Sequence, residues 1–281
     1  MTSAVVLAVT SDYIFSAANV IIGIEAKSPN FCNEYIIFVE DLEKVDNYEI
    51  CALQMCVPLQ KKVKILDSRS IIPEFSNNSS VLEKFLGRYS KMALVKVYMP
   101  RLFIDSSLTG TNQYDYLLWL DSDTLILDDI SRILDNGLVC GCMGNIAIDK
   151  LTNKKLFTCL DGSDVKPNGG VILYKRQFID ILTNEGIDYF SIVDETLTEL
   201  ISTNQQFIDE FTICISLKKT KQDKCYLTVI GNEYNCDPRY FYYNNPKIVH
   251  SVGGGSKFWN NPLMNRFSQI GKKTIDTGYF Y

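Results

Sequence analysis

The 281-residue sequence has one histidine, no C-x-x-C pair and no long apolar run. Nothing approaches the roughly 20 apolar residues of a membrane-spanning helix, and no Lys or Arg precedes the short apolar run at the N-terminus. We therefore expect neither a membrane span nor a signal peptide. The nine cysteines lack zinc-ribbon spacing and are odd in number, which favours buried free thiols in a cytoplasmic protein.

An excess of positive charge is also missing. Lys and Arg number 28 against 33 Asp and Glu, which gives a formal net charge of -5. Binding along a nucleic-acid backbone needs a basic face, so we exclude nucleic acid as the main partner. With 46% hydrophobic and 22% charged residues, the composition is that of an ordinary soluble globular protein.

Apolar runs predict alternating strands and helices. We expect strands at residues 3–10, 34–39, 62–66, 116–120, 169–175 and 247–250, with helices at residues 16–27 and from residue 80 to an interruption near Pro100. This alternation favours an α/β fold in which helices flank a mainly parallel sheet. No repeat or linker divides the chain, so we expect a single domain over residues 1–281.

The usual phosphate-binding signatures, G-x-G-x-x-G and Walker A, do not occur. The first strand candidate instead runs into Thr10, Ser11 and Asp12. These residues either cap the next helix or face a ligand. Because ligands of open α/β sheets gather at the carboxyl ends of strands, this turn and Asp121 could face one crevice.

Two aspartates interrupt the apolar segment YDYLLWLDSDTLIL at residues 114–127. Residues 124–127 read as a direct continuation of the strand at 116–120, so a surface turn fits Asp121 and Asp123 poorly. At about 5 Å and an effective dielectric near 20, two carboxylates repel by roughly 3 kcal/mol. A cation or protons must compensate. Mn²⁺, or alternatively Mg²⁺, together with a diphosphate suits such hard oxygen ligands.

The single histidine, His250, ends a strand candidate and precedes the stretch SVGGGSKFW. It is either a structural residue or a metal ligand. The three glycines allow backbone N–H groups to approach an anion, and Lys257 adds a positive charge; a flexible closing loop is the other interpretation. Asn168-Gly169-Gly170 is either a turn or a sugar contact, and Asn204, before Gln205, is most simply a helix cap.

In their order along the chain, these motifs resemble glycosyltransferase family 8, the retaining, metal-dependent family that includes glycogenin and lipopolysaccharide galactosyltransferases. The polar turn, a helix-borne cation, D-x-D, N-x-G-V, a D-Q pair and a closing H-x-x-G-x-x-K-P-W motif have counterparts between residues 3 and 260. The resemblance implies a Rossmann-like GT-A fold. Residues 1–123 would form the nucleotide-binding half, and residues 124–281 the half for sugar, acceptor and closing loop.

The resemblance also implies ligands and roles. The donor would be UDP-glucose, UDP-galactose or UDP-N-acetylglucosamine, the metal Mn²⁺, and the acceptor a glycan, protein or small molecule. The matching positions are the uridine turn Thr10, Ser11 and Asp12; the phosphate-binding cation Lys96; the D-x-D motif Asp121, Ser122 and Asp123, whose aspartates bind metal with His250; the donor-sugar residues Asn168 and Gly169; and the closing-loop residues Gly253 and Lys257.

Two departures from the family pattern concern the chemistry. The closing motif has one extra residue before Lys257 and has phenylalanine where proline is usual. The D-Q pair is Asn204-Gln205, and an amide cannot be the nucleophile of a double displacement. Either another carboxylate approaches the anomeric carbon, or the acceptor attacks from the leaving-group face, with Asn168 and Gln205 orienting the sugar. The candidate carboxylates are Asp161, Asp164 and Asp209.

Two alternatives to hexosyl transfer follow from the same residues. Asn204 motivates a degenerate protein that binds a UDP-sugar without transfer. LLWLDSDTL superficially resembles the nucleophile motif of haloacid-dehalogenase phosphatases, but Thr124 directly follows Asp123, which is the wrong offset, and the motif lies far from the N-terminus. A homodimer is an alternative to a monomer.

Overall fold

The computed structural model describes residues 2–10, 13–73, 91–110, 113–135, 139–142, 168–202, 208–220, 227–236 and 245–251. The strands are β1 (Ser3–Val9), β2 (Glu34–Val39), β3 (Lys62–Asp67), β4 (Tyr116–Leu120), β5 (Thr124–Ile126), β6 (Val139–Cys142), β7 (Asn168–Lys175), β8 (Leu227–Ile230) and β9 (Ile248–His250). The α-helices are α1 (Ile14–Lys27), α2 (Asn47–Met55), α4 (Met92–Tyr98), α5 (Ser106–Thr109), α6 (Arg176–Asn184), α7 (Tyr189–Ser202) and α8 (Ile208–Lys219).

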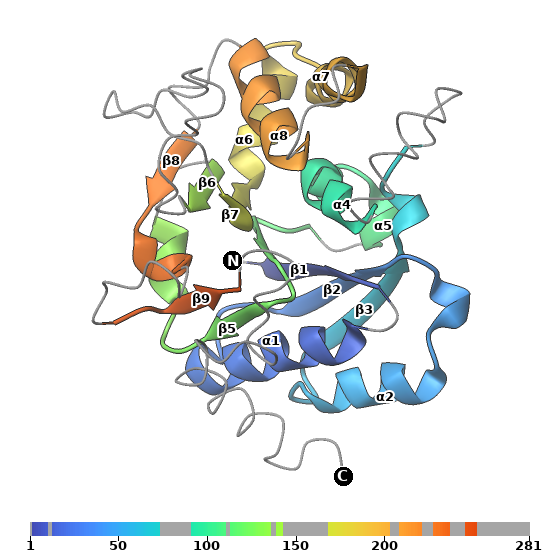
Figure 1. The fold of residues 1–281 in the computed structure, drawn as a ribbon, viewed down its shortest axis with the longest axis vertical. Coiled ribbons are helices and arrows are strands. Elements are labelled where there is room, and N and C mark those ends of the chain that lie inside the picture. Colours follow the sequence, from blue (N-terminus) through green and yellow to red (C-terminus); the bar gives the residue numbers. More distant parts are fainter. Residues whose placement is uncertain are drawn as a thin grey trace.

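Seven strands form the central sheet, in the order β3-β2-β1-β4-β7-β6-β8 (Figure 1). The pairs β1 with β2, β1 with β4, β2 with β3 and β6 with β8 are parallel. Strand β7 runs antiparallel to both of its neighbours, β4 and β6. The sheet is therefore mainly parallel with one reversed strand, and the expected mixed α/β fold is confirmed.

Helices cover both faces of this sheet, so its central strands are buried on both sides. Along β1, Val5 and Leu7 point into an apolar cluster with α1 and α2, whereas Ala4 and Val6 point into a second cluster with α4, α6, α7 and α8. Figure 1 shows these two groups of helices on opposite sides of the strands. This double burial explains why β1 reads as an unbroken apolar run rather than an alternating one.

The predicted strands agree with the observed ones to within one residue at each end, and α1 begins two residues earlier than predicted. The helix expected from residue 80 is described from residue 91 onwards, as α4 followed by a 3-10 helix, Met99–Phe103. Pro100 lies in the first turn of this 3-10 helix. Because proline lacks an N–H group and clashes with the preceding turn, the α-helix ends there as expected.

The prediction that residues 124–127 continue β4 directly is wrong. The N–H of Thr124 donates to the carbonyl of Asp121 at 3.2 Å, which closes a turn between the two strands. After this turn, β5 pairs with β9 in a separate two-stranded sheet. This sheet packs closely against α1, because a Cβ atom on Gly23 of α1 would lie only 3.0 Å from Ile126 of β5. The D-x-D motif thus joins two sheets.

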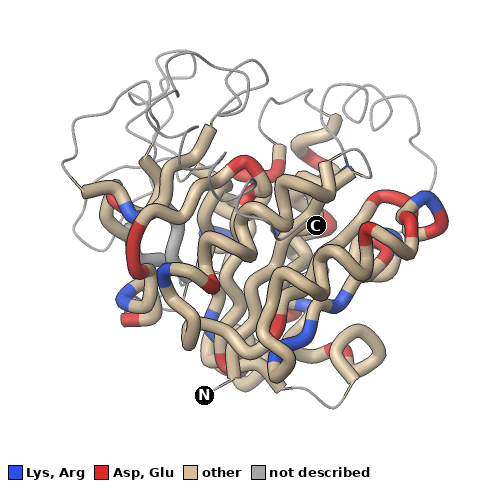
Figure 2. Tube along the Cα trace, turned by 90° about the horizontal axis from the view of Figure 1, so that it is seen from below, with Lys and Arg blue, Asp and Glu red and all other residues tan. Residues whose placement is uncertain are grey.

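Acidic and basic residues are interspersed along the outer helices and their connections (Figure 2). Among the helices that the structure describes, none has both the length and the apolar character needed to cross a bilayer.

Candidate metal and donor site

The site begins where β1 and β4 end. These strands run parallel, with Val6 opposite Trp119, so their carboxyl ends lie at the same edge of the sheet. Thr10 follows β1 and Asp121 follows β4 at this edge. Directly after β4, the N–H of Asp121 donates a hydrogen bond to the carbonyl of Gly170 on β7, at 2.8 Å. The topology thus brings a polar turn, the D-x-D motif and the start of β7 to one edge.

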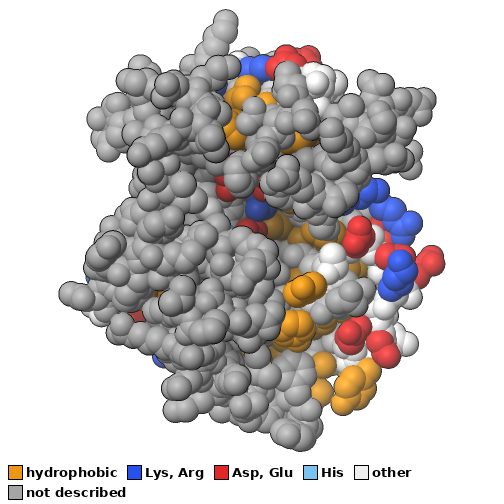
Figure 3. Space-filling model, in the orientation of Figure 1, with side chains coloured by type: hydrophobic (Ala, Val, Ile, Leu, Met, Phe, Trp, Pro, Cys, Tyr) orange, Lys and Arg blue, Asp and Glu red, His pale blue; other side chains and the backbone are white. Residues whose placement is uncertain are grey.

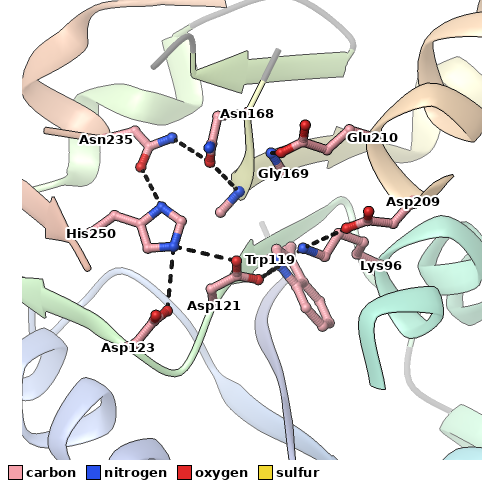
Figure 4. A network of polar contacts seen from close by, with 11 residues as sticks. Lys96, Trp119, Asp121, Asp123, Asn168, Gly169, Asp209, Glu210, Asn235 and His250 are labelled. Carbon is pink, nitrogen blue, oxygen red and sulfur yellow. Dashed lines mark hydrogen bonds and ion pairs between the residues drawn. The ribbon is translucent and has the colours of Figure 1, made fainter. Parts of the chain in front are cut away.

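The small sheet brings the only histidine to the two aspartates. His250 on β9 lies opposite Thr124 on β5, and the N–H of Ser251 donates to the carbonyl of Asp123 at 3.1 Å. His250 Nε2 lies 3.4 Å from Asp121 Oδ2 and 3.3 Å from Asp123 Oδ1 (Figure 4). One ligand atom from each of the three residues lies within 4.8 Å of the others. Two carboxylates and one imidazole form a donor set that suits a first-row divalent cation.

The carboxylates of Asp121 and Asp123 lie so close together that a positive group between them is favourable. Burial disfavours the charged form of His250, but Asp123 and Asp121 outweigh it and raise its pKa to about 9. Burial also opposes ionisation of Asp121, yet Lys96 and His250 hold the pKa of Asp121 well below its usual range. Without a metal, the proton on the imidazole therefore compensates the two carboxylates. A divalent cation can replace that proton.

Lys96 is a buried cation on α4, only 4% exposed. Its Nζ lies 3.0 Å from Asp121 Oδ1, 3.2 Å from Asp209 Oδ2 and 5.3 Å from the centre of the Trp119 ring. Burial would lower the pKa of Lys96, but Asp121 and Asp209 outweigh it and raise this pKa above its ordinary value. Trp119 Nε1 also donates to Asp121 Oδ1, at 2.8 Å. One oxygen of Asp121 is thereby held, while the other faces His250.

The Asn168-Gly169-Gly170 segment begins β7 and is not a turn. A Cβ atom on Gly170 would lie 2.1 Å from Cε1 of His250, and one on Gly169 would lie 3.1 Å from Nζ of Lys96. The first distance is impossible for a real side chain, so only glycine lets the imidazole pack against the strand. The two glycines therefore leave room for the side chains of His250 and Lys96 beside β7.

Sequence reasoning missed three contributors: Trp119, which holds Asp121, and also Asn235 and Glu210. Asn235 Oδ1 lies 2.9 Å from His250 Nδ1, and Glu210 Oε1 accepts from the N–H of Gly169 at 2.9 Å. Asn235 reaches the site because the next residue, Cys236, bridges to β9. No local pattern marks such a contact. Glu210 follows Asp209, which sequence reasoning did name as a candidate carboxylate.

The predicted site residues divide into two groups. The structure brings together Lys96, Asp121, Asp123, Asn168, Gly169 and His250, with Ser122 in the turn between the aspartates and Thr10 at the same sheet edge. Figure 3 shows acidic and basic side chains together near the middle of one face. The following predicted residues lie outside the described residues: Ser11, Asp12, Asp161, Asp164, Asn204, Gln205, Gly253 and Lys257.

No protein-family model matches the sequence, and no curated protein matches it. Solved structures of glycosyltransferases are similar in fold. An active-site mutant of LgtC has a TM-score of 0.65 at 15% identity, covering 98% of this chain and 95% of that one. The galactosyltransferase LgtC in complex with donor and acceptor sugar analogues has a TM-score of 0.62 at 15% identity, with 96% and 95% covered. The apo form of the glycosyltransferase GlyE from Streptococcus pneumoniae TIGR4 has a TM-score of 0.63 at 15% identity, covering 99% of this chain and 61% of that one.

These likenesses extend over nearly the whole chain, and at such low identity they establish the fold alone. They give no support to the phosphatase alternative. The chain therefore has the GT-A fold of these glycosyltransferases, as expected from its sequence, and its structural neighbours are consistent with the resemblance to family 8.

Proposed function

We propose that this protein is a retaining, metal-dependent hexosyltransferase that takes its sugar from UDP-glucose, UDP-galactose or UDP-N-acetylglucosamine. The observation that carries the proposal is the cluster of Asp121, Asp123 and His250, with ligand atoms within 4.8 Å, at the strand ends of a GT-A fold. LgtC, a neighbour in fold, is a galactosyltransferase that binds donor and acceptor sugar analogues. In this proposal, residues 1–123 bind the nucleotide and residues 124–281 the sugar and acceptor.

The donor set fits Mn²⁺, with Mg²⁺ as the alternative. Asp121, Asp123 and His250 would hold the ion, since two carboxylates and an imidazole already converge where positive charge is needed. When bound, such an ion supplies Lewis-acid compensation of the negative charge on a diphosphate leaving group. This interpretation also answers why two aspartates interrupt an apolar segment.

Lys96 prepares Asp121 for this task. The contacts from Lys96 and Trp119 both reach Oδ1, at 3.0 and 2.8 Å, so they fix the carboxylate orientation and leave Oδ2 toward His250. Lys96 is also a permanent positive charge beside the site, because neighbouring carboxylates keep it protonated. A preorganised charge of this kind stabilises developing negative charge without reorganisation during the reaction.

The family carboxylate is replaced by Asn204, so another group must stabilise the anomeric centre. Of the three candidate carboxylates, Asp209 is the one that the described residues bring to the site, 3.2 Å from Lys96. A carboxylate at this position is the kind of group that can act as the nucleophile of a double displacement. We therefore propose Asp209 for this role, with acceptor attack from the leaving-group face as the alternative. Asn168 and Gln205 would orient the sugar.

The variant Asp123→Ala tests the metal role. We expect it to fold, because Asp123 lies in a turn at the edge of the sheet, and to lose both Mn²⁺ binding and Mn²⁺-dependent release of UDP. A folded variant that keeps a near-normal rate would refute the metal role.

The rival function is a degenerate binder of UDP-sugar, which Asn204 favours. The variant Asn204→Asp restores the carboxylate of the family motif. A large gain in transfer would support degeneration of an ancestral enzyme, whereas an unchanged rate in an active protein would show that position 204 does not limit transfer.

A further inference from the structure

A chain of hydrogen bonds behind the metal site connects the backbone of β7 to the imidazole ring of His250 (Figure 4). The N–H of Gly170 donates to Asn168 Oδ1 at 2.8 Å, and Asn235 Nδ2 donates to the same oxygen at 3.1 Å. Asn235 Oδ1 then lies 2.9 Å from His250 Nδ1. The exposed fractions of Asn168, Asn235 and His250 are 8%, 3% and 4%. Buried polar groups of this kind need partners within the protein.

The direction of every bond in this chain follows from its first member. A backbone N–H can only donate, so the Asn168 atom that faces Gly170 must be the carbonyl oxygen. The Asn235 atom that faces this oxygen must be a donor, which is Nδ2. The other end of the same amide, Oδ1, can only accept. His250 Nδ1 must therefore carry a proton.

The opposite edge of the ring faces the aspartates. With a proton on Nδ1, the neutral imidazole has its lone pair on Nε2, which lies 3.4 Å from Asp121 Oδ2 and 3.3 Å from Asp123 Oδ1. The ring is also confined, because its Nδ1 and Cε1 atoms pack over Gly170, where any Cβ would lie 2.2 and 2.1 Å away. The lone pair is thus presented at the position where the two carboxylates can bind the same cation.

We propose that Asn235 is a positioning residue of the metal site and that, together with Asn168, it holds His250 as the Nδ1–H form so that Nε2 binds the cation. This inference rests on the metal role in the proposed function and goes beyond it. It gives Asn168 a role in addition to orienting the sugar. It also gives a role to Asn235, which belongs to none of the sequence motifs. Groups that hydrogen-bond to the other ring nitrogen of a histidine ligand fix its tautomer, and losing them commonly alters metal affinity by about 10- to 100-fold.

The composition of the chain makes a direct test practical. The sequence contains one histidine, so protein labelled with ¹⁵N-histidine gives the two ring-nitrogen signals of His250 alone. Zn²⁺ is a suitable probe because it is diamagnetic and accepts imidazole and carboxylate ligands. In the wild-type protein with Zn²⁺, we expect a two-bond ¹H–¹⁵N spectrum to show the proton on Nδ1 and the metal on Nε2.

Two substitutions at position 235 separate positioning from packing. Asn235→Ala removes the acceptor, and we expect a loss of the defined Nδ1–H signal and a fall in Zn²⁺ affinity of about 10- to 100-fold. Asn235→Asp retains an oxygen for the Nδ1 proton but loses the donor to Asn168 Oδ1. We expect it to keep the wild-type tautomer and to bind Zn²⁺ more tightly than Asn235→Ala, although the lost donor lowers the free energy of unfolding. A purely structural role would not be rescued by the acceptor alone.

The outcomes also distinguish the inference from the proposed function. Zn²⁺ bound through Nδ1, or unchanged affinity and ring signals in Asn235→Ala, would overturn the inference and leave the metal site standing. A folded wild-type protein that binds no Zn²⁺ would overturn the metal role and the inference with it. No UDP-sugar is present in these measurements, so neither donor identity nor transfer activity affects them.

Discussion

The imidazole of His250 packs so closely over Gly170 that a Cβ atom there would lie 2.1 Å from Cε1 of the ring. We expect Gly170→Ala to displace His250 and weaken Mn²⁺ binding by at least about tenfold, because a shifted ring no longer shares a cation with the carboxylates. Titration of Mn²⁺ followed by electron paramagnetic resonance measures this. Gly169→Ala is the matched control, since its Cβ would meet Lys96 Nζ at 3.1 Å and Glu210 Cγ at 3.2 Å, and neither of these residues is a proposed metal ligand. Equal affinities in both variants would contradict the packing argument.

Metal binding should depend on pH through His250. Its pKa, raised to about 9 by Asp123 and Asp121 against the effect of burial, means that a cation must displace a proton from Nε2 at neutral pH. We expect Mn²⁺ affinity to rise about tenfold per pH unit between pH 6 and pH 8 and to level off above pH 9. Calorimetry in two buffers of different ionisation enthalpy should find nearly one proton released at pH 7. Binding without proton release would contradict this.

Lys96 should matter for stability as well as for function. Lys96→Met leaves Asp121 and Asp209 without their shared buried cation, and breaking a buried ion pair in this way lowers the free energy of unfolding by about 3–5 kcal/mol. Lys219→Met is the control. Lys219 lies 3.0 Å from Glu199, the same distance as between Lys96 and Asp121, but this ion pair is on the surface. An exposed pair contributes about 0–1 kcal/mol. Urea unfolding of both variants measures the difference, and equal losses would refute the buried role.

Asp209 can be separated from the metal ligands by experiment. We expect Asp209→Asn to lower the transfer rate by at least about 100-fold while Mn²⁺ affinity stays within a few-fold, because Asp209 contacts Lys96 and not the proposed cation. A rate close to that of the wild type would exclude Asp209 as the nucleophile. The remaining possibilities would then be Asp161, Asp164 or acceptor attack from the leaving-group face.

The cysteines provide a test of the fold. Burial raises the pKa of the thiols of Cys32 and Cys56 to about 11, whereas Cys51 is exposed. Because the thiolate is the reactive form, we expect iodoacetamide at pH 8 to modify Cys51 before Cys32 and Cys56, and to reach these two only after unfolding. Peptide mapping by mass spectrometry reads out the order. Rapid modification of Cys32 in the native protein would contradict the packing of this region.

The sequence predicted strands most accurately where they are buried on both faces of the sheet. The strand at residues 116–120 and its neighbour β1 were located to within one residue because strands buried on both faces form continuous apolar runs. The same signal misled at residues 124–127. These are as apolar as the strand before them, because β5 is also buried, against α1. Periodicity cannot show that a chain has moved from one sheet to another.

The site residues could be predicted only where a residue type suited to metal binding occurs in a recognisable local sequence pattern. Asp121, Asp123 and His250 were named from the sequence, because a D-x-D after a core strand and a solitary histidine before glycines stand out. Asn235 was not, since its contact with His250 depends on the pairing of Cys236 with β9. Contacts made through tertiary pairing leave no local pattern in the sequence.

The most direct test of the account is the release of UDP from UDP-glucose, UDP-galactose and UDP-N-acetylglucosamine, each measured with Mn²⁺ and with EDTA. We predict release from one donor with Mn²⁺ and none with EDTA, which would identify both the sugar and the metal requirement. Binding of UDP without release from any donor, in the presence of candidate acceptors, would favour the degenerate binder. A folded protein that neither releases nor binds UDP in the presence of Mn²⁺ would contradict the account.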